Sequence, residues 1–143
     1  MLINIVVAAV LMVITTVIHT GAMSLTHVIL NRFKKKHSKY RLLNSNVRRI
    51  GIIVILMFYI SLAEVLLWAS AYLLLNAIEG FEKAFYFSMV TFTTLGYGEI
   101  VLGERWRLLA SFEAANGIIM FGWSTAIVIF AVQHVYARKD GDI

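Results

Sequence analysis

Three apolar segments, each long enough to cross a lipid bilayer as a helix, constrain this 143-residue sequence more than any other feature. They cover residues 5–30, 50–75 and 108–136, and their only Asp, Glu, Lys or Arg residues are Glu64 and Glu113. A helix needs about 20 mostly apolar residues to cross a hydrocarbon core of about 30 Å. With 60% hydrophobic and 15% charged residues, the chain is too apolar for an ordinary soluble domain. We therefore predict an all-α membrane protein with three transmembrane helices.

The absence of two residue types narrows the chemistry further. The sequence has no cysteine, which excludes disulfides and thiolate metal sites, and no proline, so no helix carries a forced kink. Histidine pairs at metal-binding helical spacing are absent, so we expect no transition-metal site and no cofactor. An intramembrane enzyme or proton-coupled transporter built on His19, Glu64 and Glu113 is a competing hypothesis. We do not favour an enzyme, because the sequence shows neither a nucleophile arrangement nor a metal spacing.

Basic residues indicate how the chain crosses the membrane. Eight of the thirteen Lys and Arg residues lie within 31–49, where there is no acidic residue. The positive-inside rule places this linker in the cytoplasm, with the N-terminus outside and the C-terminus inside. The first helix has no preceding basic region and is followed by lysines, so we read it as retained rather than as a signal peptide. The linker fixes the topology and can also hold anionic lipid head groups, whereas nucleic-acid binding is not expected.

The connection between the second and third helices contains a second apolar element. Residues 81–93 are too short to span a membrane and too apolar for a solvated loop, which is typical of a re-entrant helix. Glu79 and Glu82 lie near its start, where acidic residues offset the positive end of a helix dipole. The negative C-terminal end then points toward the membrane centre, where it favours a cation.

A glycine-containing segment, Thr93-Thr94-Leu95-Gly96-Tyr97-Gly98-Glu99, follows this short helix. Glycines two residues apart permit positive φ, which lets successive carbonyl groups point the same way. A ring of such carbonyls from several copies can replace the water around a dehydrated monovalent cation. Non-helical backbone at membrane depth is tolerated only where it is buried in protein or lines a water-filled cavity. The segment therefore indicates a pore.

Thr94-Leu95-Gly96-Tyr97-Gly98 resembles the selectivity filter of potassium channels, whose usual core is Thr-Val-Gly-Tyr-Gly followed by Asp. The order of helix, aromatic-rich short helix, filter and helix is also similar. The resemblance implies a small prokaryotic channel of the two-helix pore type in the cell (inner) membrane, crossing it several times. It divides the chain into an extra N-terminal helix (1–30), the basic linker (31–49), a pore domain (50–136) and a short cytoplasmic tail (137–143). Within the pore domain it implies an outer helix (50–75), a pore helix (81–93), the filter (94–98) and an inner helix (108–136).

The same resemblance implies four identical copies around a central axis and potassium as the permeant ion. The ion-coordinating residues are then Thr94, Leu95, Gly96, Tyr97 and Gly98, through main-chain carbonyls and the Thr94 hydroxyl. Leu95 replaces the usual valine and Glu99 the usual aspartate. The leucine leaves the carbonyl unchanged, but its packing behind the filter can alter filter stability. The alternative is a non-conducting or weakly selective channel-like subunit, which keeps the filter sequence only as a structural remnant. Such a subunit would not need to keep both glycines.

Several residues are predicted to support the filter. Val90 occupies a pore-helix position where some family members carry a buried glutamate, so a carboxylate must come from elsewhere. We expect Glu113 to fill this role by packing toward Ser88 or Thr91; the alternative is a neutral, hydrogen-bonded buried carboxyl. We expect the Tyr97 ring to pack against the pore helix, with its hydroxyl bonded to a partner such as Tyr86.

The third apolar segment supplies the predicted inner helix. Helical spacing places four residues toward a cavity below the filter, with subunit packing as the alternative: Ile118, Phe121, Thr125 and Ile129. Gly117 and Gly122 lie at positions similar to the gating hinge of the family, although Gly122 equally fits a close helix–helix approach. No segment carries regularly spaced arginines, so a conventional voltage sensor is not expected.

His19 and Glu64 are predicted to meet between neighbouring antiparallel helices. Counted from the cytoplasmic ends of their helices, they differ in depth by about 4.5 Å at a rise of about 1.5 Å per residue. Buried ionisable groups in a membrane usually pair with one another. Such a pair serves either as a structural connection between helices or as a pH sensor.

Overall fold

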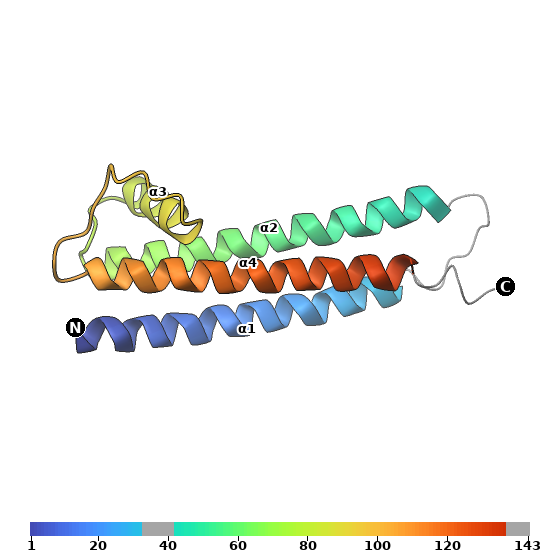
Figure 1. Ribbon diagram of the computed structural model, residues 1–143, viewed down its shortest axis with the longest axis horizontal. Helices are drawn as coiled ribbons and strands as arrows, with labels where there is room; N and C mark the ends of the chain where they lie inside the picture. Colours follow the sequence, from blue (N-terminus) through green and yellow to red (C-terminus); the bar gives the residue numbers. More distant parts are fainter. Residues whose placement is uncertain (33–41, 137–143) are drawn as a thin grey trace.

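The computed structural model describes residues 1–32 and 42–136, and this part of the chain is helical without any strand. Three long helices lie side by side, and a short helix packs at one end against two of them (Figure 1). Each long helix is long and apolar enough to cross a membrane. The predicted fold class, an all-α protein with three apolar spans and one short helix between the second and third, is therefore confirmed. The helices are α1 (Leu2–Arg32), α2 (Leu42–Leu74), α3 (Phe81–Phe92) and α4 (Arg107–Tyr136).

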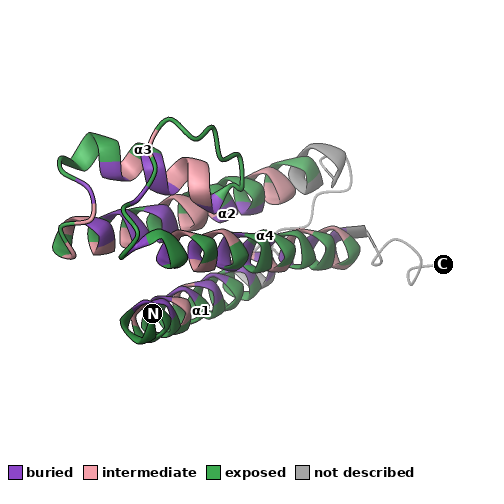
Figure 2. Cartoon of the chain, turned by 60° about the vertical axis from the view of Figure 1, so that its left-hand side comes forward, coloured by how far each residue is buried: buried purple, intermediate pink, exposed green. Residues whose placement is uncertain are grey.

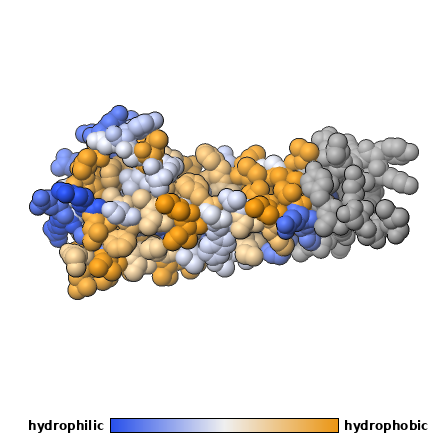
Figure 3. Space-filling model, in the orientation of Figure 1, coloured by the Kyte–Doolittle hydropathy of each residue, from blue (hydrophilic) through white to orange (hydrophobic). Residues whose placement is uncertain are grey.

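The outer surface of the three long helices is apolar. Large hydrophobic side chains such as Val17, Val54 and Phe58 are exposed along α1 and α2. Hydrophobic residues cover much of the length of the molecule, and hydrophilic residues gather at the end that carries α3 (Figure 3). Such a surface is unfavourable in water but matches the hydrocarbon of a bilayer. This distribution is the one expected of a multi-pass membrane protein.

The buried face of α1 follows an eleven-residue repeat. Eight of its residues are buried with spacings of four, three and four along the helix. Eleven residues in three turns give about 3.67 residues per turn, close to the α-helical value, so this face stays on one side of the helix. It packs against both α4 and α2. The eight residues are Asn4, Ala8, Leu11, Thr15, His19, Ala22, Thr26 and Leu30.

The outer helix begins earlier than the sequence suggested. The prediction placed residues 31–49 in a linker and the start of the helix at Ile50, but α2 starts at Leu42. Loss of hydrophobicity marks where a helix leaves the hydrocarbon, whereas propagating an existing helix by a further two turns costs little in the absence of proline. The lysines of the predicted linker lie outside the described residues.

The short helix α3 packs against α2 and α4 at one end of the bundle. It follows Gly80, which has φ of 90°, carries Glu82 in its first turn, and ends one residue earlier than predicted, with Thr93 as its C-cap. Ala84, Phe87 and Phe92 belong to a buried cluster shared with α1, α2 and α4. The loop after α3 is exposed over most of its length in the single chain (Figure 2). The buried residues therefore fix the position of α3, while the segment that follows α3 lies on the surface of the single chain.

Replacing the buried Ala22 of α1 with leucine should loosen the three-helix packing. Ala22 is 3% exposed and belongs to a buried cluster with Met57 of α2 and Ile127 of α4, and overpacking of a core position typically costs about 1–3 kcal/mol. We expect Ala22→Leu to lower the thermal unfolding midpoint in detergent, measured by circular dichroism. The exposed neighbour Met23 provides the control, since Met23→Leu should leave the midpoint unchanged. Equal midpoints for the two variants would contradict the packing of α1.

Candidate functional site

The last turn of α3 continues directly into the glycine-containing segment. The amide of Thr94 donates to the carbonyl of Thr91 at 2.9 Å, which closes the end of the helix. The amides of Leu95 and Gly96 both donate to the carbonyl of Val90, at 3.0 and 3.2 Å. The main chain of Val90, rather than its side chain, thus holds the start of the segment. A shift in this turn of α3 would be passed on to the segment through these bonds.

The backbone of the segment changes handedness at alternate residues. Positive φ values occur at Thr94 (60°), Gly96 (56°) and Gly98 (81°), while Leu95 and Tyr97 between them are not among the positive-φ residues. Glycine adopts positive φ freely, but for an L-residue such as threonine this conformation costs about 1–2 kcal/mol. Such strain persists only where the surrounding structure enforces it, and it clusters at functional sites.

The side chains of the glycine-containing segment are exposed on the surface of the single chain. Tyr97 is 64% exposed and Leu95 is 54% exposed, although both are large apolar side chains. The predicted packing of Leu95 behind the segment is therefore not made within one chain. One chain also provides only one edge of any site that the segment forms.

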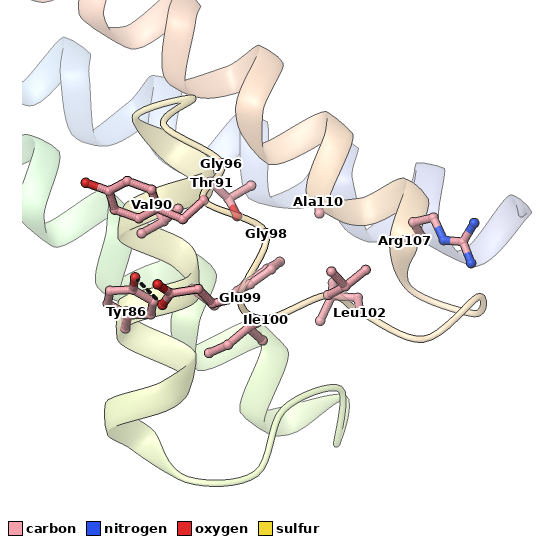
Figure 4. Close-up of a pocket in the computed structure, with 13 residues that line it drawn as sticks. Tyr86, Val90, Thr91, Gly96, Gly98, Glu99, Ile100, Leu102, Arg107 and Ala110 are labelled. Atoms are coloured by element: carbon pink, nitrogen blue, oxygen red, sulfur yellow. Dashed lines mark hydrogen bonds between the residues drawn. The ribbon is translucent and has the colours of Figure 1, made fainter.

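The hydroxyl of Tyr86 is bonded to Glu99, whereas the sequence suggested Tyr86 as one partner for the Tyr97 hydroxyl. The Tyr86 hydroxyl donates to Glu99 Oε2 at 2.9 Å, and this hydrogen bond raises the pKa of Tyr86 above its ordinary value (Figure 4). A carboxylate is a stronger acceptor than a phenol, and it lies one residue past the last glycine. The bond ties the outer end of the segment to the exposed side of α3, and a cavity of about 160 Å³ lies alongside, reaching Arg107 and Ala110 of α4.

Glu113 is the centre of a buried cluster behind α3. The Ser88 hydroxyl lies 2.5 Å from Glu113 Oε1, so the predicted contact between these two residues is confirmed. The hydroxyl of Tyr72 donates to Glu113 Oε2 at 2.6 Å, and Ser88 also lies 2.9 Å from the carbonyl of Val65. Tyr72 was not predicted from the sequence, although a tyrosine within an apolar segment needs a polar partner when it is buried, and this was the available signal. The cluster joins α2, α3 and α4.

A second buried cluster attaches α1 to the other long helices. His19 Nδ1 lies 2.6 Å from Glu64 Oε1 on α2, which confirms the predicted contact, and Nε2 lies 3.0 Å from Ser124 Oγ on α4. The His19 ring also packs on Trp123 at 5.4 Å between centroids. Ser124 was not predicted from the sequence, because nothing in the residue spacing of α4 marks which of its faces meets α1. The order of carboxylate, imidazole and hydroxyl is that of a serine-hydrolase triad. Here the three groups come from three helices and are buried, so they connect the helices.

The four residues predicted to face a cavity lie on an exposed side of α4. Ile118 and Ile129 are exposed, the hydroxyl of Thr125 donates to the carbonyl of Phe121 within the same helix, and the Phe121 ring packs edge-on against Phe92 of α3 at 5.6 Å between centroids. The face is therefore available to a cavity or to another copy, and its role stays a prediction.

The oxygen donors at this site are mainly those of the main chain. The part of the chain that the structure describes has no cluster of three or more His, Asp or Glu side chains able to hold a metal. The segment itself offers its carbonyls and the Thr94 hydroxyl. Oxygen donors of this type suit hard, weakly bound cations better than transition metals.

The comparison with known protein families agrees with this geometry. Residues 54–134, more than half of the chain, match a family model described as "Ion channel". The chain belongs to this ion-channel family, and the matched region includes most of α2, all of α3, the segment after it and nearly all of α4. Helix α1 precedes the match. No curated protein and no solved structure matches the chain.

Replacing His19 should destabilise the association of α1 with the rest of the chain. His19→Leu leaves the buried Glu64 carboxyl without its partner, and breaking a buried pair typically costs about 3–5 kcal/mol. We expect a large drop in unfolding midpoint in detergent, and a smaller drop for Ser124→Ala, which removes one hydrogen bond. Val17→Leu, at a position of the same helix that is 67% exposed, is the control and should have little effect. A His19→Leu midpoint equal to the control would refute the connection.

Proposed function

We propose that this chain is a subunit of a potassium-selective channel, in which four copies place residues 94–98 around a common axis. The observation that carries the proposal is the alternation of positive φ along Thr94, Gly96 and Gly98, directly after a short helix fixed in the core. Alternating handedness turns successive carbonyls to the same side of the chain. Four such rows would supply stacked rings of oxygen that replace the hydration shell of K⁺.

Ion passage then follows from the number and strength of these rings. The carbonyls of Thr94, Leu95, Gly96 and Tyr97 and the Thr94 hydroxyl form successive sites, each moderately favourable. Ions in adjacent sites repel one another, so entry of one promotes the exit of another. The C-terminal end of α3, whose carbonyls carry the negative end of the helix dipole, precedes the filter and favours a cation below it.

Assembly from several copies is supported by what one chain leaves exposed. Four large apolar side chains are exposed in the single chain: Leu95 and Tyr97 at the segment, and Ile118 and Phe121 on α4. In a closed ring of four, the segment side would face neighbouring filters and pore helices, and this face of α4 would border the cavity below. The ion channel family as a whole is consistent with ion permeation by an oligomer.

One buried contact and one exposed contact would hold the filter in shape. Glu113 and Ser88 fix α3 against α4, which compensates for the lack of a carboxylate at Val90. The bond of Tyr86 to Glu99 restrains the outer end of the filter. We place the N-terminus outside and the C-terminus in the cytoplasm of a prokaryotic cell, since the basic linker favours that orientation.

Gly96→Ala should abolish selective potassium flux. Gly96 has φ of 56°, where alanine is strained by about 1–2 kcal/mol in each copy, so the carbonyl row would be reoriented. The measurement is ion flux into liposomes that contain purified protein, with potassium and sodium gradients compared. Gly103→Ala is the matched control, because Gly103 lies in the same outer loop with open space around it and no positive φ. Unchanged potassium flux in Gly96→Ala would refute a filter mechanism.

Channel activity should depend on anionic lipid at the cytoplasmic face. The linker carries eight Lys and Arg residues per copy, and each basic residue near an anionic surface contributes about 1 kcal/mol of attraction. We expect flux to rise when anionic lipid is added to neutral vesicles, and expect the rise to shrink when Lys34, Lys35 and Lys36 are replaced by glutamine. Lys83→Gln on α3, at the end of the bundle remote from the last turn of α1, is the control. Flux that is indifferent to lipid charge in the unmodified chain would contradict this role.

A further inference from the structure

Helices α3 and α4 meet along two successive turns in the same register. Ser88 bonds to Glu113 on the first turn, and four residues later on both helices Phe92 lies against Gly117. The two contacts differ in kind: the first joins side chains, and the second brings backbone against backbone. Phe92 is the last residue of α3 and lies two residues before Thr94, the first residue of the predicted filter.

Gly117 has no room for any side chain. A Cβ atom built on Gly117 would lie 1.9 Å from the carbonyl oxygen of Phe92 and 2.9 Å from its carbonyl carbon. Both distances are shorter than real Cβ contacts, and the obstructing atoms belong to the main chain, so no rotamer change can relieve the overlap. The glycine is therefore required by the close approach of the end of α3.

The overlap could not be relieved by sliding α3 as a whole. Ser88 is held between Glu113 Oε1 and the carbonyl of Val65, and it is fully buried. With the middle of the helix fixed in this way, a shift of about 1 Å forced at position 117 would fall on the last turn of α3. That turn includes the Val90 carbonyl, which accepts both the Leu95 and the Gly96 amides. Functional sites generally need their groups held within about 0.5 Å.

We propose that Gly117 is a positioning residue for ion selectivity: it docks the C-terminal end of α3 onto α4 and thereby sets the filter carbonyls. This inference rests on the proposed channel function and gives Gly117 an explanation different from a gating hinge. Gly122, five residues further along the same continuous helix, has open space around it in the chain. A comparison of the two glycines therefore distinguishes the effect of losing a close contact from the effect of making the helix less flexible.

The test compares Gly117→Ala with Gly122→Ala in liposomes, after each variant is shown to assemble like the unmodified chain. The readout is the ratio of potassium to sodium flux, which a change in gating alone or in the amount of folded protein does not alter. We expect Gly117→Ala to lower the ratio by about tenfold or more, as misplacement by about 1 Å does in other preorganised sites, and Gly122→Ala to keep it within about twofold. A selective Gly117→Ala channel with altered open time would overturn the inference in favour of a hinge. Absence of selective flux from the unmodified chain would instead overturn the proposed channel function.

A measurement on the unmodified chain covers the case in which Gly117→Ala does not fold. Solid-state NMR on protein labelled at the Gly117 Cα and the Phe92 carbonyl carbon reports the distance between them in lipid. We expect the two carbons to stay in contact in potassium under conditions that open and that close the channel. Separation of the two carbons on opening would overturn the docking role, because a hinge at Gly117 would pull α4 away from α3.

Discussion

Hydrogen-bonded and close-packed contacts between helices carry the arrangement of this protein, because apolar side chains gain little by exchanging lipid for protein. The bond of Ser88 to Glu113 is the contact on which the candidate site depends most. It holds α3 between α2 and α4, with Tyr72 bonded to the second carboxylate oxygen. A helix of only twelve residues is marginally stable by itself, so its position in the bundle depends on such contacts with its neighbours.

Helix α1 uses the same kind of interaction between Asn4 and His19. Its buried face contains four polar residues among the apolar ones, and three of them contact the rest of the bundle through side-chain bonds: Asn4 to the carbonyl of Arg105, Thr15 to Asn116, and His19 to Glu64 and Ser124. These bonds fix which residues of α1 face α4. A helix that precedes the segment shared with the ion-channel family is thereby made part of one bundle with it.

Much of the architecture was predictable, because hydropathy and helix length are local properties. The three spans, the short helix before the glycines, and the contact of His19 with Glu64 all follow from counting residues along apolar segments. The start of α2 at Leu42 was not predictable in this way, since hydropathy ends at the membrane surface while the helix continues. The partner of the Tyr86 hydroxyl was not predictable in this way either: Tyr86 was suggested as one partner for Tyr97, but its hydroxyl donates to the carboxylate of Glu99, which is a better acceptor than a phenol.

The sequence by itself determined that the chain crosses a membrane three times and carries a filter-like Thr-Leu-Gly-Tyr-Gly segment after a short helix, because these features depend on composition and on neighbours along the chain. Only the tertiary structure decided that Tyr72 donates a hydrogen bond to Glu113 and that the His19 ring is hydrogen-bonded to Ser124. The close approach of Gly117 to the carbonyl of Phe92 was likewise decided only by the tertiary structure. Each of these contacts joins different helices, and the rotation of one helix about its axis relative to another is set by packing across the whole interface. A long apolar helix is hydrophobic on all sides, so its sequence leaves that rotation undetermined.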